Sequence, residues 1–204
     1  MANKMDADEF KFPDEVDEPK GEAEDFEFEI EDDTPPEDRD KKPMPKEQVK
    51  EIIKCGKDPQ YFMNKYCKIQ HPTRGLIPFS TYPFQDDCVS DFNKHRFNIV
   101  LKSRQLGLST VTAMYAVWMA LYHRDKNILI IATKLGVAMN IIKKVKTAIS
   151  ALPSWLILPE IKSSTKTIVE FGNGSSIKSI PTSEDAGRSE ALSLLIIDEA
   201  AWIS

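Results

Sequence analysis

The distribution of apolar residues divides this chain into a polar N-terminal tail and a longer region in which apolar positions recur regularly. In residues 49–56 and again in 62–69 they recur every three or four positions. This is the spacing of helices that bury one face. We therefore predict two short helices in this region, followed by a turn-bounded segment, 75–85, that leads into a helix over 86–94.

Farther along, short apolar runs alternate with longer helical patterns. The predicted strands are 98–102, 127–132 and 194–197, and the helices between them are 109–123 and 137–151. Strands that alternate with helices indicate an α/β fold with a mostly parallel sheet flanked by helices. The last strand is apolar at every position, which is typical of a strand buried on both faces.

Residues 167–180 interrupt this alternation. They read TIVEFGNGSSIKSI, two alternating runs joined by Gly172-Asn173-Gly174. Such glycine-rich turns between alternating runs are typical of β-hairpins. We expect a β-hairpin inserted into the α/β sheet.

Charge separates the same two regions. Residues 1–40 hold 18 Asp/Glu against 4 Lys/Arg, a net charge of −14, so residues 41–204 hold the other 14 acids and 23 bases, a net charge of +9. A segment so charged cannot bury a core, so we predict a disordered acidic tail over 1–42 and a folded domain over 43–204. The basic body suits a polyanionic partner. The tail either keeps the protein soluble or competes for that basic surface.

Cysteine and hydropathy patterns exclude some classes. Cys55, Cys67 and Cys88 have no metal-ligand spacing and suit reduced thiols of a cytosolic protein. No apolar run approaches the length that spans a membrane, and the acidic N-terminus does not suit a signal peptide.

The segment after the first predicted strand, SRQLGLST (103–110), suits phosphate binding. Its backbone N–H groups can hold a polyphosphate, and the hydroxyl of Ser109 can bind Mg²⁺. Compared with the usual GxxxxGK[ST] loop, Leu108 replaces the lysine and Lys102 replaces the first glycine. We infer that Lys102 supplies the missing cation. The alternative is a degenerate loop that binds no nucleotide.

A second segment, LLIIDEAA, places Asp198 and Glu199 at the end of a predicted strand. Asp198 can hold Mg²⁺ together with Ser109, and Glu199 can orient and deprotonate the attacking water. The alternative is that this acidic pair merely caps the following segment.

Two arginines, one phenylalanine and one glutamine complete the candidate site. Arg104 can contact the γ-phosphate or form a surface ion pair, and Arg188 can serve a neighbouring subunit or simply solvate its loop. Phe84 can stack on adenine and Gln85 can pair with it, although Phe84 also suits an ordinary core. The predicted nucleotide-binding residues are Phe84, Gln85, Lys102, Ser103, Gln105, Leu106, Gly107, Leu108, Ser109 and Thr110. Glu199, Arg104 and Arg188 are the predicted catalytic residues.

With these motifs the chain resembles the large terminase subunit of tailed bacteriophages, the DNA-packaging ATPase, and in particular its T-even-like branch. The resemblance extends from about Pro45 to Ser204, and the matching stretches occur in the same order and spacing as in the family. The matching stretches are DPQYFMNKYCKI, GLIPFSTYPFQ, SRQLGLST, GNGSSI, GRSEALS and LLIIDEAAWI.

The resemblance implies a P-loop fold of the RecA-like (ASCE) group, with ATP and Mg²⁺ as cofactors. It implies that Gln85 contacts adenine, that Arg104 is the P-loop arginine and that Arg188 is a finger acting in trans. Some members of the family carry a lysine where Lys102 stands. Implied partners are double-stranded DNA, a portal protein, a small terminase subunit and a ring of like subunits. The implied location is the host cytoplasm, without a membrane.

The family's coupling motif and nuclease domain do not occur in this sequence. We therefore expect the chain to be the front portion of a larger packaging ATPase, truncated within its ATPase domain. Two alternatives stay open: a helicase-like P-loop ATPase, and a fragment that binds nucleotide or a partner without turnover.

Overall fold

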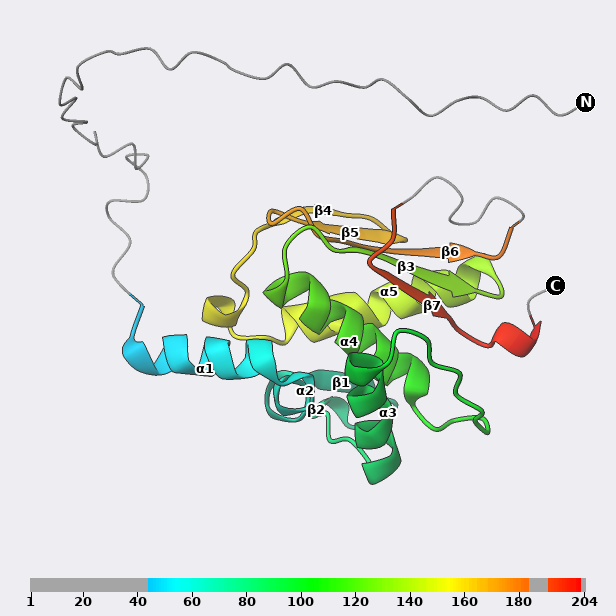
Figure 1. Cartoon of the computed structure of the whole chain (residues 1–204), viewed down its shortest axis with the longest axis horizontal. Helices are drawn as coiled ribbons and strands as arrows, with labels where there is room; N and C mark the ends of the chain where they lie inside the picture. Colours follow the sequence, from blue (N-terminus) through cyan, green and yellow to red (C-terminus); the bar gives the residue numbers. More distant parts are fainter. Residues whose placement is uncertain (1–43, 184–190, 203–204) are drawn as a thin grey trace, which may run out of the picture. The chain divides into compact units, whose positions relative to one another are not determined.

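A five-stranded sheet forms the centre of the protein, in the strand order β4-β5-β6-β3-β7 (Figure 1). The computed structural model describes residues 44–183 and 191–202. The strands are β3 (Asn127–Ala132), β4 (Ile161–Ser164), β5 (Ile168–Phe171), β6 (Ser176–Pro181) and β7 (Leu194–Ile197). The predicted acidic tail lies outside the described residues.

The sheet is mixed, not mostly parallel as predicted. Strand β3 runs parallel to both of its neighbours, β6 and β7. The pairs β4–β5 and β5–β6 are antiparallel, and β5–β6 is the hairpin expected around Gly172-Asn173-Gly174. The hairpin joins the sheet through β6, and β4, a polar strand that the pattern did not predict, extends it at the edge. The hairpin was expected within the sheet, but with β4 it contributes two antiparallel pairs, as many as the parallel pairs that β3 forms.

Five helices and a second, smaller hairpin complete the described residues. The helices are α1 (Lys46–Lys57), α2 (Pro59–Tyr66), α3 (Pro83–Lys94), α4 (Leu108–Tyr122) and α5 (Leu135–Ser150), with short 3-10 turns η2 (Ser154–Leu156) and η3 (Ala200–Trp202). The hairpin is β1 (Lys68–His71) with β2 (Gly75–Pro78), where a continued helix and a turn-bounded segment were expected. Within this part of the chain, no helix has both the length and the apolar character needed to cross a bilayer.

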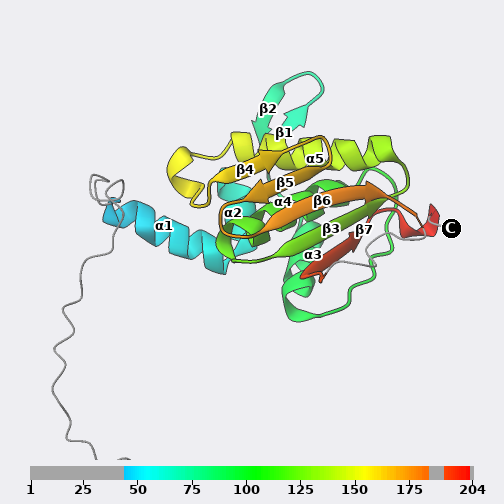
Figure 2. The same ribbon diagram turned by 90° about the horizontal axis from the view of Figure 1, so that it is seen from above.

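Helices α4 and α5 cover one face of the sheet, as the views from the side and from above both show (Figures 1 and 2). Alternate residues of β3, Ile128 and Ile130, belong to the core on this face and are 0% and 1% exposed. Helix α4 is apolar around almost its whole circumference, so ten of its 15 residues are buried. A helix of this kind has to lie in the interior, and here it lies between the sheet and the helices α2 and α3.

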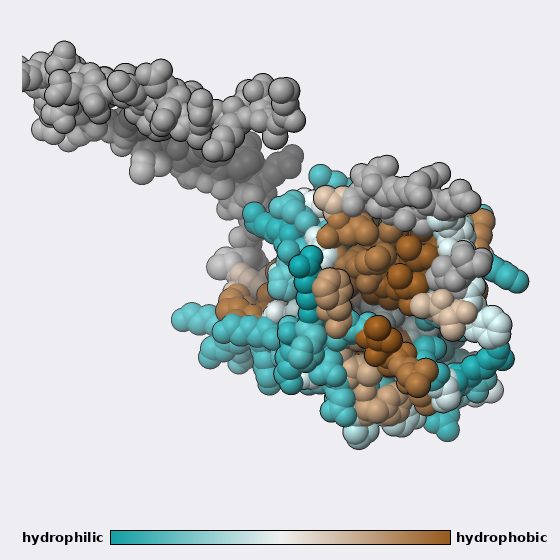
Figure 3. Space-filling view, turned by 45° about the vertical axis from the view of Figure 1, so that its right-hand side comes forward, coloured by the Kyte–Doolittle hydropathy of each residue, from teal (hydrophilic) through white to brown (hydrophobic). Residues whose placement is uncertain are grey.

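Residues 97–103 do not form the strand predicted over 98–102. No backbone–backbone hydrogen bond joins them to any other described residue. Ile99 and Leu101 are fully exposed, and hydrophobic residues gather on this side of the molecule in Figure 3. A strand needs a neighbour for its N–H and C=O groups. Both edges of β3 are occupied, and the segment does not pair with β7.

Strand β7 also differs from its prediction. It was expected to be buried on both faces, yet Leu195 and Ile197 are each 47% exposed. The reason is its position at the end of the strand order, where only β3 flanks it. An edge strand loses the cover that a second neighbour would give.

The turn of the large hairpin holds the C-terminal end of α4. The Asn173 amide nitrogen donates to the carbonyl oxygens of Ala120 and His123, at 2.9 and 3.1 Å. The Ser175 hydroxyl donates to the same His123 oxygen at 2.8 Å. The last carbonyls of a helix have no partner within it. The hairpin therefore satisfies these groups and fixes α4 against the sheet.

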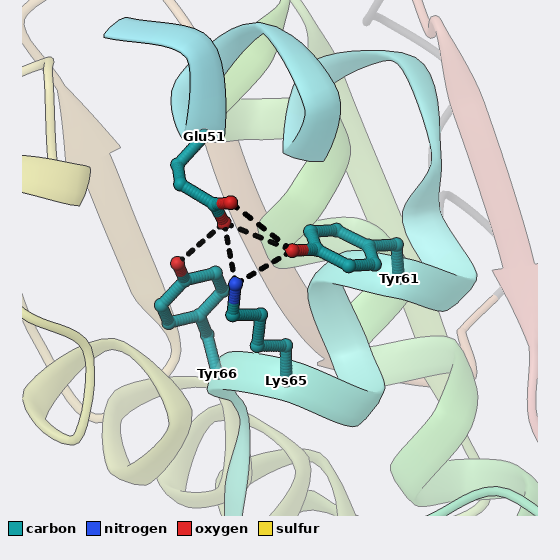
Figure 4. A network of polar contacts seen from close by, with 4 residues as sticks. All are labelled: Glu51, Tyr61, Lys65 and Tyr66. Carbon is teal, nitrogen blue, oxygen red and sulfur yellow. Dashed lines mark hydrogen bonds and ion pairs between the residues drawn. The ribbon is translucent and has the colours of Figure 1, made fainter. Parts of the chain in front are cut away.

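A polar network joins α1 to α2 (Figure 4). The Glu51 carboxylate accepts hydrogen bonds from Lys65 Nζ at 2.8 Å and from the Tyr66 hydroxyl at 2.7 Å. The Tyr61 hydroxyl donates to Glu51 at 3.0 Å and accepts from Lys65 at 2.6 Å. The hydrogen bonds from Lys65 and Tyr66 lower the pKa of Glu51 from 4.5 to about 2. This network thus links the side chains of α1 and α2 at a partly exposed position.

Candidate functional site

The candidate site centres on the start of α4, where the turn over 103–107 meets the helix. Gly107 occupies the N-cap with a φ of 72°, and no side chain caps the helix there. Gln105 also has a positive φ, 64°, which is uncommon for a residue other than glycine. The first N–H groups of a helix have no partner within it and carry positive potential. An uncapped start of this kind suits an anion such as a phosphate.

Gln85 of α3 holds this turn from behind. Its side chain is 2% exposed, its amide nitrogen donates to the Leu106 carbonyl at 2.7 Å, and its amide oxygen accepts from the Tyr82 N–H at 3.1 Å. A Cβ atom at Gly107 would lie only 3.0 Å from the Gln85 amide nitrogen, and the positive φ of 72° at this position also favours glycine. The observed role of Gln85 is thus to position the turn. Its contact with adenine stays a prediction.

Ser109 and Asp198, which are 89 positions apart, meet at the site. The Ser109 hydroxyl donates to the Asp198 carboxylate at 3.0 Å. Asp198 directly follows β7, and its N–H continues the pairing with β3 by donating to Ile131 at 2.9 Å. Hydroxyl and carboxylate oxygens are suitable ligands for Mg²⁺, which usually keeps only one or two protein carboxylates besides phosphate oxygens. The donor set at this point therefore fits that ion.

Glu199 follows at the rim of the site. It is exposed and has a φ of 57°, and its carbonyl accepts a hydrogen bond from Trp202 in η3 at 2.9 Å. The chain thus turns sharply directly after the sheet, so the two carboxylates do not continue the alternation of the strand. The position is open to water, as the predicted role requires.

The predicted arginines differ in what the structure shows of them. Arg104 is exposed within the turn, where its side chain has no hydrogen bond or ion pair to the described residues. Arg188 lies outside the described residues, so its place at the site stays a prediction.

Two lysines approach the start of α4. Lys102 is half-buried in the segment before the turn. Lys144 comes from α5, and its Nζ donates to the Thr110 hydroxyl at 3.1 Å. Partial burial of its amino group lowers the pKa of Lys144, and nearby Lys102 lowers it further, whereas Asp198 acts in the opposite direction. Sequence patterns did not indicate Lys144, because it lies in an ordinary amphipathic helix 34 positions from Thr110.

An exposed aromatic pair begins α3. The rings of Tyr82 and Phe84 are stacked, with centroids 5.8 Å apart and planes 6° from parallel. Tyr82 is 64% exposed and Phe84 is 39% exposed, so Phe84 is not the core residue that its alternative reading suggested. Tyr82 had not been predicted as a site residue, although its spacing of two from Phe84 across Pro83 was a usable signal.

A hollow of about 690 Å³ lies elsewhere on the described surface. Its lining includes Arg124, Asp125, Glu160, Lys162 and the hairpin turn Gly172–Gly174. None of the predicted site residues belongs to it. The chemistry that the motifs predict therefore lies on the exposed turn at the start of α4, not in this hollow.

Comparisons with known proteins bear on the fold and on the family. The fold is similar to the crystal structure of the large terminase of bacteriophage HK97, with a TM-score of 0.53 and 14% sequence identity. The match covers 70% of this chain but only 37% of that one, so the chain spans little more than a third of that protein's length. Residues 99–204, which are 106 of the 204 residues, match the family described as terminase large subunit, T4likevirus-type, N-terminal. The chain therefore belongs to this family of terminase large subunits.

Proposed function

We propose that this chain is the nucleotide-binding front part of a DNA-packaging ATPase, whose parent hydrolyses ATP to drive double-stranded DNA into a procapsid. The observation that carries the proposal is the hydrogen bond between Ser109 and Asp198 at the uncapped start of α4. It joins the two motifs that a nucleoside triphosphatase requires, one for phosphate and one for the metal. Membership of the terminase family supports the packaging role.

The residues of this chain have separate tasks in that reaction. The N–H groups at the start of α4 bind the phosphates, while Ser109 and Asp198 would hold Mg²⁺, which would supply positive charge to the phosphate oxygens. Glu199 orients and deprotonates the attacking water from its exposed position. Arg104 and Lys102 contribute positive charge toward the γ-phosphate, and Arg188 supplies an arginine to a neighbouring subunit. Phe84 and Gln85 face the adenine side.

Binding partners follow from charge and family. The net charge of +9 over residues 41–204 suits contacts with DNA phosphates, which are indifferent to sequence and weaken with salt. A ring of like subunits would assemble on a portal protein in the host cytoplasm, with a small terminase subunit as a further partner.

Titration of the purified chain with Mg·ATP tests the proposal. The wild type should bind, and Asp198→Asn should lose Mg²⁺-dependent affinity while its thermal unfolding stays cooperative. In the complete protein, Glu199→Gln should retain ATP binding and lose turnover, because only the water-activating group is removed. A wild-type chain that binds neither ATP nor ADP with Mg²⁺ present would refute the proposed function.

A further inference from the structure

Adjacent hydroxyls in the first turn of α4 each contact one charged side chain. Ser109 bonds to the Asp198 carboxylate at 3.0 Å, and Thr110 accepts a hydrogen bond from Lys144 at 3.1 Å. The two charges come from different elements, the end of β7 and the middle of α5. The start of α4 is therefore flanked by one anion and one cation, and the cation, Lys144, is not among the residues that the motifs predicted.

The packing of α5 explains why Lys144 reaches this point. Ile141 and Val145 are buried, at 3% and 0% exposure, and they belong to the core that also includes α4. Lys144 directly precedes Val145, so its stem leaves the helix at the border of the buried face and its amino group reaches α4. Both lysines are exposed as whole residues, but Lys143, one position earlier, has no hydrogen bond or ion pair to the described residues.

The surroundings of Lys144 favour an anionic ligand. Lys102 lies close enough to lower its pKa, and Asp198 is the acid that opposes this effect. Within the described residues Lys144 forms no ion pair, and its hydrogen-bond acceptor is a neutral hydroxyl. Two ammonium groups near an uncapped helix start repel each other. A polyphosphate between them would relieve this repulsion.

The sequence of the loop leaves room for such a cation. Leu108 stands where the loop usually has its lysine, and its side chain is 6% exposed in the apolar interior. It can neither carry charge nor turn toward a ligand. Lys102 alone would leave the phosphates with one lysine before the turn, whereas Lys144 adds a second on the side of Thr110.

We propose that Lys144 is a phosphate-binding residue: on nucleotide binding its ammonium group leaves the Thr110 hydroxyl and pairs with an oxygen of the di- or triphosphate. The inference rests on the proposed function, since it names a further ligand of the same site. The class of ligand is a nucleoside polyphosphate. Adenosine, which has no phosphate, would not engage Lys144.

Matched single substitutions on α5 test this role. Lys144→Gln should weaken Mg·ATP and Mg·ADP binding by about tenfold or more, as expected for a lost charge-assisted hydrogen bond. Lys143→Gln removes the same charge from the same helix and should change affinity by less than about twofold, because Lys143 makes no contact with α4 and salt screens a distant charge. Lys144→Arg should recover most of the affinity. Affinities are measured by calorimetric titration of the full chain, with thermal unfolding as the test of folding.

A competitor without a base separates the phosphate contact from an indirect effect. Inorganic tripolyphosphate should displace a fluorescent ATP analogue from the wild type and do so less effectively from Lys144→Gln. Equal affinities of Lys144→Gln and Lys143→Gln, with the wild type binding normally, would overturn the role of Lys144 and leave the proposed function intact. Absence of binding by the wild type would instead refute the proposed function, and this inference with it.

Discussion

Two runs of nearly the same composition adopt different structures in this protein, one a buried strand and the other an exposed segment without regular structure. Residues 98–101 read Asn-Ile-Val-Leu, and residues 127–130 read Asn-Ile-Leu-Ile. In the first run Ile99 and Leu101 are 100% and 101% exposed, whereas in the second Ile128 and Ile130 are 0% and 1% exposed. Both runs were predicted as strands, and only the second became one.

The difference lies in the neighbours and not in the residues. β3 has β6 on one edge, β7 on the other and helices on one face, so its backbone groups are paired and its side chains leave water. Each such side chain gains about 1.5–3 kcal/mol from burial. Residues 97–103 have no strand beside them among the described residues, so the same side chains gain nothing comparable. Strand formation is a property of the sheet as a whole.

A charge placed in each run gives the largest expected effect. Ile130→Asp buries a carboxylate without a partner inside the core, which costs at least about 4 kcal/mol of unfolding free energy. The variant should fail to unfold cooperatively or should show a strongly lowered midpoint in urea, followed by circular dichroism.

The matched control makes the same change in the exposed run. Ile99→Asp should alter the unfolding free energy by less than about 0.5 kcal/mol, because the site already faces water. Amide hydrogen exchange should agree, with fast exchange at 99–101 and strong protection at 128–131. Equal destabilisation by the two substitutions would show that both runs are packed in solution, and the comparison would then be wrong.

A smaller effect is expected where the buried region depends on polar contacts. Asn173→Ala removes the hydrogen bonds to Ala120 and His123 and the one that its oxygen accepts from Ser175 N–H at 3.1 Å. The Ala120 carbonyl loses this partner while His123 keeps the Ser175 hydroxyl, so the unfolding free energy should fall by about 1–3 kcal/mol. Asn140→Ala, on the exposed side of α5, should be nearly neutral in the same urea titration. A neutral Asn173→Ala would mean that water replaces these bonds at no cost.

The sequence predicted the buried parts of the fold well. The alternation of apolar runs and helical patterns located β3, α4, α5 and the β5–β6 hairpin to within a few residues, because these elements carry strong periodicity. It missed β4 and the β1–β2 hairpin, whose strands have four residues each and include polar or charged positions. Such short strands form because neighbours are available, and that information is not local.

The site was predictable where it depends on one motif meeting another. Ser109 and Asp198 were expected to meet and they do. Lys144 could not be predicted, since its contact with Thr110 depends on how α5 packs against α4. Gln85 shows a different limit: the resemblance implied a contact with adenine, which stays a prediction, whereas its hydrogen bond to Leu106 depends on tertiary packing.

The smallest effect should come from the network that is half in water. Glu51 and Lys65 are 30% and 44% exposed, so solvent screens their ion pair, and its loss should cost less than the loss of Asn173. Glu51→Gln should therefore lower the urea midpoint only slightly near neutral pH. The pH dependence of this small difference is more informative than its size.

Because the network lowers the pKa of Glu51 from 4.5 to about 2, the unfolded chain takes up this proton first as the pH falls. Stabilisation by Glu51 is complete above pH 4.5 and is lost progressively as the pH falls toward 2. The difference in unfolding free energy between the wild type and Glu51→Gln should shrink over that window, while other carboxylates affect both proteins equally. If the difference in unfolding free energy stayed constant across the window, solvent exposure would leave Glu51 with an ordinary pKa. The α1–α2 network would then add no more to stability than the exposed residues 97–103 do.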